Sequence, residues 1–153
     1  MTSRALIVVD MQNGFCHPDG SFSRIGMGLE GAEAAVRNAD VVDELGCGPE
    51  DLVVDKVRFD AFQWTSLEPL LRGLGVGELI VCGVVTNLCV ETTIRSAFMR
   101  DYPVTLLADC CAAKTRRLHE LSVEVLTSYE LAEMARIGDG YDLSPDDRTA
   151  IRA

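Results

Sequence analysis

ELIVCGVVTNLCVETTIRSAF (residues 78–98) predicts a buried strand that leads directly into a helix. Its first half is a nearly continuous apolar run rich in β-branched residues, which is typical of a strand buried on both faces of a parallel sheet. Its second half begins a helical pattern that we expect to cover residues 88–101. A buried strand followed by a helix is the repeating unit of an α/β fold.

The same strand pattern recurs on both sides of this stretch. Three further apolar runs are LIVVD (6–10), LVVDK (52–56) and VTLLADC (104–110), and EMARIG (133–138) is compatible with a short last strand. Helical spacing of apolar residues separates them, at 32–45, 67–74 and 115–132. Alternating strands and helices predict an α/β fold that is doubly wound, with a mostly parallel sheet and helices on both of its faces.

The length and composition indicate one domain. At 153 residues and 48% hydrophobic, the chain can bury a core of its own, and no shift in composition marks a second unit. We therefore expect a single domain over residues 1–153. Within it, residues 139–153 (DGYDLSPDDRTAIRA) are acidic and lack periodicity, which predicts a loosely attached C-terminal tail.

The charge balance argues against polyanionic partners. With 24 acidic and 14 basic residues the net charge is −10, whereas binding to nucleic acid or acidic membranes depends on Lys and Arg. The N-terminal apolar run ALIVV (5–9) is too short for a signal peptide or a membrane span. We therefore expect a cytoplasmic protein with no nucleic-acid or membrane partner and six reduced cysteines.

Residues 11–31 predict a long functional loop. They carry five glycines and a proline without periodicity, and a loop of this length in a compact domain usually borders the site. The glycines match neither of the common phosphate-binding patterns. We expect no cofactor.

Three polar residues lie at strand ends of the predicted sheet. Asp10 ends one strand, Lys56 ends another, and Cys89 follows a third. Because ligands bind beyond the carboxyl ends of parallel strands, the fold should bring these side chains together. Thr86 or Asn87 could cap the following helix and leave Cys89 in its first turn. The helix dipole and the Lys56 ammonium would then lower the pKa of the cysteine.

This arrangement predicts nucleophilic catalysis. Asp10 could accept the thiol proton and return it to a departing amine, while the backbone N–H groups of Val85 and Cys89 hold the oxyanion. Singly, Asp10 could be a turn residue, Lys56 an edge-strand charge and Cys89 a buried thiol. Their coincidence at three strand ends favours catalysis.

These residues also carry a family resemblance. IVVDMQNGF (7–15), the segment from VDKVRFDAF to TTIRSAF (54–98) and YPVTLLADCCAA (102–113) resemble the isochorismatase-like cysteine hydrolase superfamily, which includes nicotinamidases and carbamoylsarcosine and ureidoacrylate amidohydrolases. The resemblance implies an Asp10, Lys56, Cys89 triad that cleaves an amide or ureido bond of a small molecule. Members that cleave a vinyl ether lack the cysteine, so Cys89 favours the amide-cleaving branch.

Other expectations follow from the same resemblance. It implies a cis peptide between Val84 and Val85, a homo-oligomer that is a dimer or larger, and substrate-lining positions at Phe15, Phe62 and Trp64. For the aromatics, a place in the core is an equal alternative for Phe15 and the better one for Trp64.

The chain departs from the family pattern before Lys56. Members have a helix, a further strand and its connection between the first strand and the lysine-bearing strand, whereas only one helical pattern intervenes here. We therefore expect a sheet one strand short, with a pocket that is open, completed by another subunit or inactive. Nicotinamidases bind a metal through histidines of that segment; this chain has only His17 and His119, so we predict no metal site.

Two other functions remain as alternatives. Cys89, Arg95 and Ser96 match the C-x5-R-[ST] pattern of cysteine phosphatases, but Glu91 and the absence of glycine make this loop a poor phosphate cradle, so we interpret the match as chance. A shortened member could also act as an interaction or regulatory protein. Cys82, Cys110 and Cys111 are expected to be small core residues.

Overall fold

The computed structural model describes residues 3–11, 19, 21–31, 52–143 and 150–153. Six strands form one sheet: β1 (Ser3–Val9), β2 (Leu52–Val53), β3 (Val76–Val84), β4 (Val104–Ala112), β5 (Glu133–Ala135) and β6 (Ala150–Arg152). The helices are α2 (Ser21–Arg24), α4 (Leu67–Gly73), α5 (Glu91–Phe98) and α6 (Arg116–Ser128), with a π-helical turn η1 (Thr86–Val90) and a 3₁₀ turn η2 (Ile137–Asp139).

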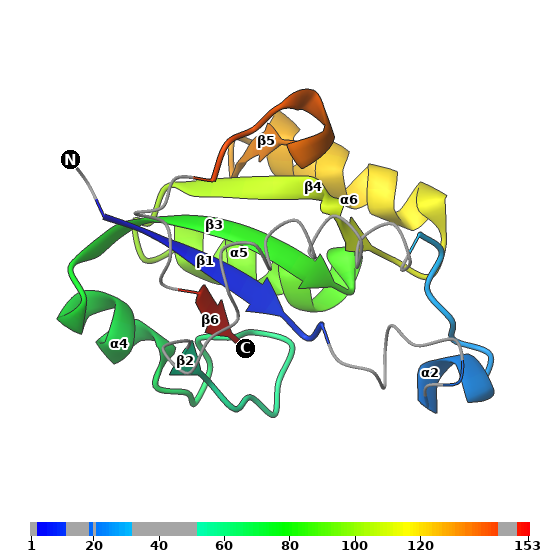
Figure 1. The fold of residues 1–153 in the computed structure, drawn as a ribbon, viewed down its shortest axis with the longest axis horizontal. Helices are drawn as coiled ribbons and strands as arrows, with labels where there is room; N and C mark the ends of the chain where they lie inside the picture. The colour runs from blue at the N-terminus through cyan, green and yellow to red at the C-terminus, as the bar shows by residue number, and fades with distance from the viewer. Residues whose placement is uncertain (1–2, 12–18, 20, 32–51, 144–149) are drawn as a thin grey trace.

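The strand order explains where a ligand can bind. The order is β2-β6-β1-β3-β4-β5, and every pair of neighbouring strands in it is parallel (Figure 1). After β1 the chain goes to one side of the sheet to form β2 and then returns to the other side to form β3. The crevice at the carboxyl ends of β1 and β3 is therefore the topological switch point, the preferred binding position in such sheets. The predicted α/β, doubly wound class is confirmed.

The core lies on the central strands. Leu6, Ile7 and Val9 of β1 are almost fully buried, as are Leu79, Ile80 and Val81 of β3 and Leu106 and Leu107 of β4. Helices α5 and α6 pack against β4, and they contribute the fully buried Ile94 and Leu126. Consecutive buried residues along one strand require cover on both faces, as the sequence pattern predicts. The predicted helix at 32–45, which would contribute to this cover, lies outside the described residues.

The first residue of α6 follows a side-chain cap. Thr115 has an extended backbone, and its Oγ1 accepts a hydrogen bond from the Leu118 N–H at 3.2 Å, which satisfies one of the free donors at the helix start. Ahead of this helix, the Glu30 carboxylate accepts from the Arg116 N–H at 2.7 Å, and Glu30 pairs with Ala113. The described part of the predicted 11–31 loop thus lies against the carboxyl end of β4.

The C-terminal segment differs from its prediction. Within residues 139–153, expected to be a loosely attached tail, Ala150–Arg152 form β6 between β1 and β2 (Figure 1). Ile151 is fully buried there. One apolar residue flanked by Ala and Arg gives no recognisable strand pattern, because the pairing comes entirely from the two neighbouring strands.

Among the described helices, none is long and apolar enough to cross a membrane. The expectation of a sheet one strand shorter than that of related proteins stays a prediction.

Candidate active site

Asp10, Lys56 and Cys89 meet at the switch point. Asp10 directly follows β1 and has a left-handed backbone with φ of 50°. Lys56 lies shortly after β2, and Cys89 lies in η1, the turn that follows β3. Because the strands are parallel, all three carboxyl ends point to the same edge of the sheet. The predicted convergence of these residues is therefore present.

Their side chains form one buried polar group. Lys56 Nζ donates to Asp10 Oδ2 at 2.5 Å, with only 7% and 10% of the two side chains exposed. The Asp10 carboxylate also accepts a hydrogen bond from the Cys89 thiol, and the Val85 N–H donates to the Cys89 sulfur. Burying an ion pair costs desolvation energy and is weak evidence for stability. A functional role explains its position better.

The pKa of Cys89 is shifted opposite to the prediction. Burial, together with the hydrogen bond and negative charge of Asp10, raises the pKa of the thiol to about 11, and the smaller effects of Lys56 and the Val85 N–H lower it. The predicted lowering of this pKa is therefore wrong. A nucleophilic role for a neutral thiol would require a neighbouring general base, which makes the Asp10 carboxylate a candidate for that role.

We expect the pH dependence of Cys89 alkylation to report the charges of Asp10 and Lys56. Iodoacetamide reacts with the thiolate, so labelling should be slow at pH 7 and rise toward a midpoint near pH 11. Asp10→Asn removes the charge that raises the pKa and should lower the midpoint. Lys56→Met removes the charge that lowers the pKa and should raise it. Peptide mass spectrometry across pH measures each midpoint; shifts of the same sign in both variants would contradict this arrangement.

The backbone after β3 brings the Val85 N–H to the sulfur. The Val84–Val85 peptide is cis, as the resemblance implies, and Gly83 before it has φ of 123°. Gly83 pairs with Val9 so closely that a Cβ at position 83 would overlap the Val9 backbone. A glycine inside an apolar strand, as at position 83, is a sequence signal for such a close approach.

The predicted helix cap at Thr86 or Asn87 is wrong. Val85 occupies the N-cap position, and no side chain caps η1. The fully buried Thr86 instead shares a 2.9 Å hydrogen bond between its Oγ1 and Nδ1 of His119 on α6, where burial lowers the pKa of His119. The cysteine-bearing turn is thus held by the neighbouring helix rather than by its own cap.

A second polar contact joins α6 to the residue that directly follows η1. Ser122 of α6 donates to Oε2 of Glu91 at 2.6 Å, and Glu91 begins α5 directly after η1. Ser122 is buried. Together with the Thr86–His119 bond, this contact fixes η1 against α6.

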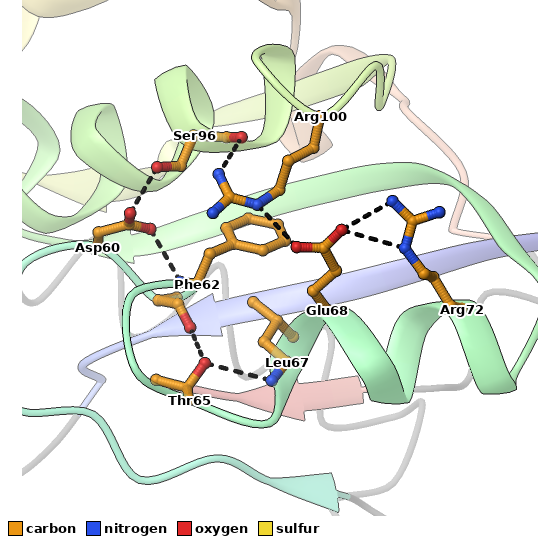
Figure 2. A network of polar contacts seen from close by, with 9 residues as sticks. Asp60, Phe62, Thr65, Leu67, Glu68, Arg72, Ser96 and Arg100 are labelled. Atoms are coloured by element: carbon orange, nitrogen blue, oxygen red, sulfur yellow. Dashed lines mark hydrogen bonds and ion pairs between the residues drawn. The ribbon is translucent and has the colours of Figure 1, made fainter.

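The loop after Lys56 is attached to α5, as Figure 2 shows in part. Ser96 donates to Oδ2 of Asp60 at 2.5 Å, and Oδ1 of Asp60 accepts from the Phe62 N–H at 2.8 Å. One turn earlier on α5, the buried Thr93 Oγ1 accepts from the Ala61 N–H at 3.1 Å. These contacts, which we call the Asp60–Ser96 clamp, tie the lysine-bearing segment to the helix that follows Cys89.

We expect Ser96→Ala to destabilise the protein by about 2 kcal/mol, because it leaves a half-buried carboxylate oxygen of Asp60 without its donor. Arg95→Ala on the same helix is the matched control. Arg95 pairs with Glu91 four residues earlier at the surface, and such pairs contribute only about 0.5 kcal/mol. Urea denaturation measures both changes. Equal losses in the two variants would show that the clamp contributes no more than a surface ion pair.

The three predicted substrate-lining aromatics differ in position. Phe62 belongs to the core: it is 5% exposed, its ring stacks on Tyr102 at 6.2 Å, and the Arg100 guanidinium lies 4.8 Å from the ring centre (Figure 2). Trp64 is 74% exposed, with the Arg58 guanidinium 4.8 Å from its ring. These contacts match the core alternative for Phe62, whereas the exposure of Trp64 shows that the core alternative for that residue is wrong. Phe15 lies outside the described residues.

The phosphatase pattern finds no support in the geometry. Arg95 projects from α5 and donates twice to Oε1 of Glu91, at 2.8 and 3.0 Å. Ser96 is bonded to Asp60. A phosphate cradle would need the arginine directed at the site of the cysteine, so the spacing match is a coincidence.

Known families and curated relatives resemble part of this chain. A family model described as the isochorismatase domain matches residues 32–137, more than half of the chain. The ureidoacrylate amidohydrolase RutB of Acinetobacter baylyi is 38% identical over 72 residues, which cover 47% of this chain and 29% of the relative. Nicotinamidase 3 of Arabidopsis thaliana is 42% identical over 76 residues, 50% of this chain and 38% of the relative. The chain spans less than two fifths of the curated relatives that it matches.

Solved structures match over nearly their whole length. An isochorismatase-like hydrolase from Alkaliphilus metalliredigens has a TM-score of 0.78 at 21% identity, over 90% of this chain and 96% of that chain. The nicotinamidase SaPncA from Staphylococcus aureus has a TM-score of 0.68 at 25% identity, over 88% and 100%. At 21% identity, the likeness to the Alkaliphilus metalliredigens protein shows the fold alone.

Proposed function

Because the chain belongs to the isochorismatase domain family, we propose that it hydrolyses an amide-type carbon–nitrogen bond of a small molecule, with Cys89 as the nucleophile. The observation that carries this proposal is the buried contact of Asp10 with both Lys56 and Cys89 at the switch point. A nucleophile, a base within hydrogen-bond reach and a group that orients the base make up the minimal machinery of covalent catalysis.

The first half of the reaction forms a thioester. Asp10 accepts the thiol proton as the Cys89 sulfur attacks the carbonyl carbon. The negative charge that develops on the carbonyl oxygen is stabilised by the N–H groups of Val85 and Cys89. Asp10 then gives its proton to the nitrogen, the carbon–nitrogen bond breaks and ammonia or an amine leaves.

The second half returns the protein to its starting state. Asp10 accepts a proton from water, and the oxygen attacks the thioester carbon. The carbon–sulfur bond breaks, the carboxylic acid leaves and the thiol is protonated again. Lys56 stays bonded to Asp10 throughout and holds its carboxylate toward the sulfur.

We propose a small primary amide or ureido compound as the substrate. The names of the relatives, a ureidoacrylate amidohydrolase and a nicotinamidase, support this class. The net charge of −10 supports a neutral or cationic small molecule over a polyanionic polymer. The expected homo-oligomer stays a prediction, and so do the absence of a metal and the cytoplasmic location.

Release of ammonia from a panel of compounds tests the proposal. The panel contains nicotinamide, ureido acids, carbamoyl amino acids and simple amides, with p-nitrophenyl phosphate as the phosphatase control. We expect turnover of at least one nitrogen compound and of no phosphate ester, and hydroxylamine should trap the acyl group as a hydroxamate. Absence of ammonia release from every compound would favour the interaction-protein alternative.

A further inference from the structure

Strand β6 separates the two strands that carry Asp10 and Lys56. On one side Ile151 and Arg152 pair with Ile7 and Val8 of β1, and on the other they pair with the two residues of β2. In the described part of the sheet, β2 is joined to the rest only through β6. The distance between the lysine-bearing and the aspartate-bearing segments is therefore set across this strand (Figure 1).

The pairing of this segment continues to Asp10 itself. The Ala153 N–H donates to the Val8 carbonyl at 3.0 Å, and the Asp10 N–H donates to the Ala153 carbonyl at 2.7 Å. Ala153 is 8% exposed, so water competes little for these bonds. Asp10 has a left-handed backbone, which a non-glycine residue adopts only where its surroundings hold it. The bond from its own amide to Ala153 is one such restraint.

The other side of the strand supports Lys56. Val54, directly after β2, is 3% exposed and belongs to the same core cluster as Ile151, which is fully buried. The lysine follows Val54 by two residues, and its Nζ donates to Asp10, which follows the strand on the other side of β6. An anchored Val54 limits how far the lysine can move from its partner.

We propose that residues 150–153 are a positioning segment for the candidate site: by filling the sheet between β1 and β2 and accepting the Asp10 amide at Ala153, they set Asp10 against Lys56 and Cys89. This inference rests on the proposed function for its catalytic consequence, but its geometric content is independent of turnover.

Loosening of residues 150–153 should first change the position of Asp10. When the amide of Asp10 loses its acceptor and β2 its neighbour, the carboxylate moves away from the Cys89 thiol. Because Asp10 raises the pKa of that thiol more than Lys56 lowers it, the pKa of Cys89 should fall while proton transfer becomes slower. A variant that is less stable but still folded, with Asp10 in place, would show no such shift in the pKa of Cys89.

Two variants at one position separate these effects. Ala153→Pro removes the N–H that bonds to Val8, whereas Ala153→Gly keeps the same backbone groups and adds no atom. We expect the proline variant to show a lower midpoint for Cys89 alkylation and, with any substrate found, at least a tenfold lower kcat with KM within twofold. The glycine variant should resemble the wild type in both. A folded proline variant with a wild-type alkylation profile would overturn the proposal.

Hydrogen exchange in the wild type gives a test that needs no variant. Protection of the Asp10 and Ala153 amides should exceed that of exposed turns, because each amide donates to a backbone carbonyl of the neighbouring segment. Free exchange of both amides would overturn the proposal even if the proline variant failed to fold. Neither the alkylation nor the exchange measurement depends on amide hydrolysis, so a failure of the proposed function stays distinguishable.

Discussion

Replacement of Cys89 by alanine is expected to lower the rate of amide hydrolysis by about 10⁴-fold or more. Loss of the nucleophile removes the covalent path completely and leaves only binding and oxyanion stabilisation, which supply the smaller part of the rate enhancement. The Asp10–Lys56 pair does not include the sulfur and should persist, so the fold should be retained. Ammonia release under saturating substrate measures the change.

Cys110→Ala is the matched control for this experiment. Cys110 is also buried, and burial raises the pKa of its thiol, but it lies in β4. Its loss should reduce stability through a small cavity and leave kcat near the wild-type value. Cys89→Ser tests the chemistry more narrowly, because a hydroxyl keeps the hydrogen bond to Asp10 but is a poorer nucleophile. A Cys89→Ala protein that retains wild-type turnover would refute the covalent mechanism.

The position of the site could be predicted from the sequence because strand ends are local features. Asp10, Lys56 and Cys89 each follow an apolar run, and in a parallel sheet such runs end at one edge. No knowledge of side-chain contacts is needed for this step. The same reasoning gave the fold class, since both rest on the alternation of strands and helices along the chain.

The electrostatics of the site depend on contacts that a sequence does not contain. A cysteine in the first turn of a helix near a lysine predicts a low pKa, yet the thiol is buried and faces the Asp10 carboxylate. Burial and the distance between two side chains are tertiary quantities. For the same reason Phe62, apolar and close to Lys56 in sequence, could be a core residue or a pocket residue until its packing on Tyr102 was known.

Two separate devices hold Lys56, and neither is visible as a motif. The Asp60–Ser96 clamp attaches the following loop to α5, and β6 supports the preceding strand. Both join segments far apart along the chain. A lysine with only one of these supports would have more freedom to leave Asp10, which explains how a strand as short as β2 can hold Lys56 at the candidate site.

Gly83→Ala is expected to lower the free energy of unfolding by about 4 kcal/mol or more. A Cβ at this position would lie 2.7 Å from the nitrogen and 2.8 Å from the carbonyl carbon of Val9, and closer still to its carbonyl oxygen. Both partners are backbone atoms of paired central strands, so neither can move without breaking the β1–β3 ladder. The φ of 123° adds a further penalty, because this region is open to glycine and costs other residues about 1–3 kcal/mol.

Two other glycines separate the steric effect from the conformational one. Gly140 has φ of 86° but open space around a Cβ, so Gly140→Ala should cost only about 1–2 kcal/mol of backbone strain. Gly73 has open space in α4, and Gly73→Ala should be neutral or slightly stabilising. Urea denaturation of the three variants measures the order of their losses in free energy of unfolding. Equal losses at Gly83 and Gly140 would refute a clash with Val9. A much larger loss at Gly83 would show that the close β1–β3 approach requires glycine at this position.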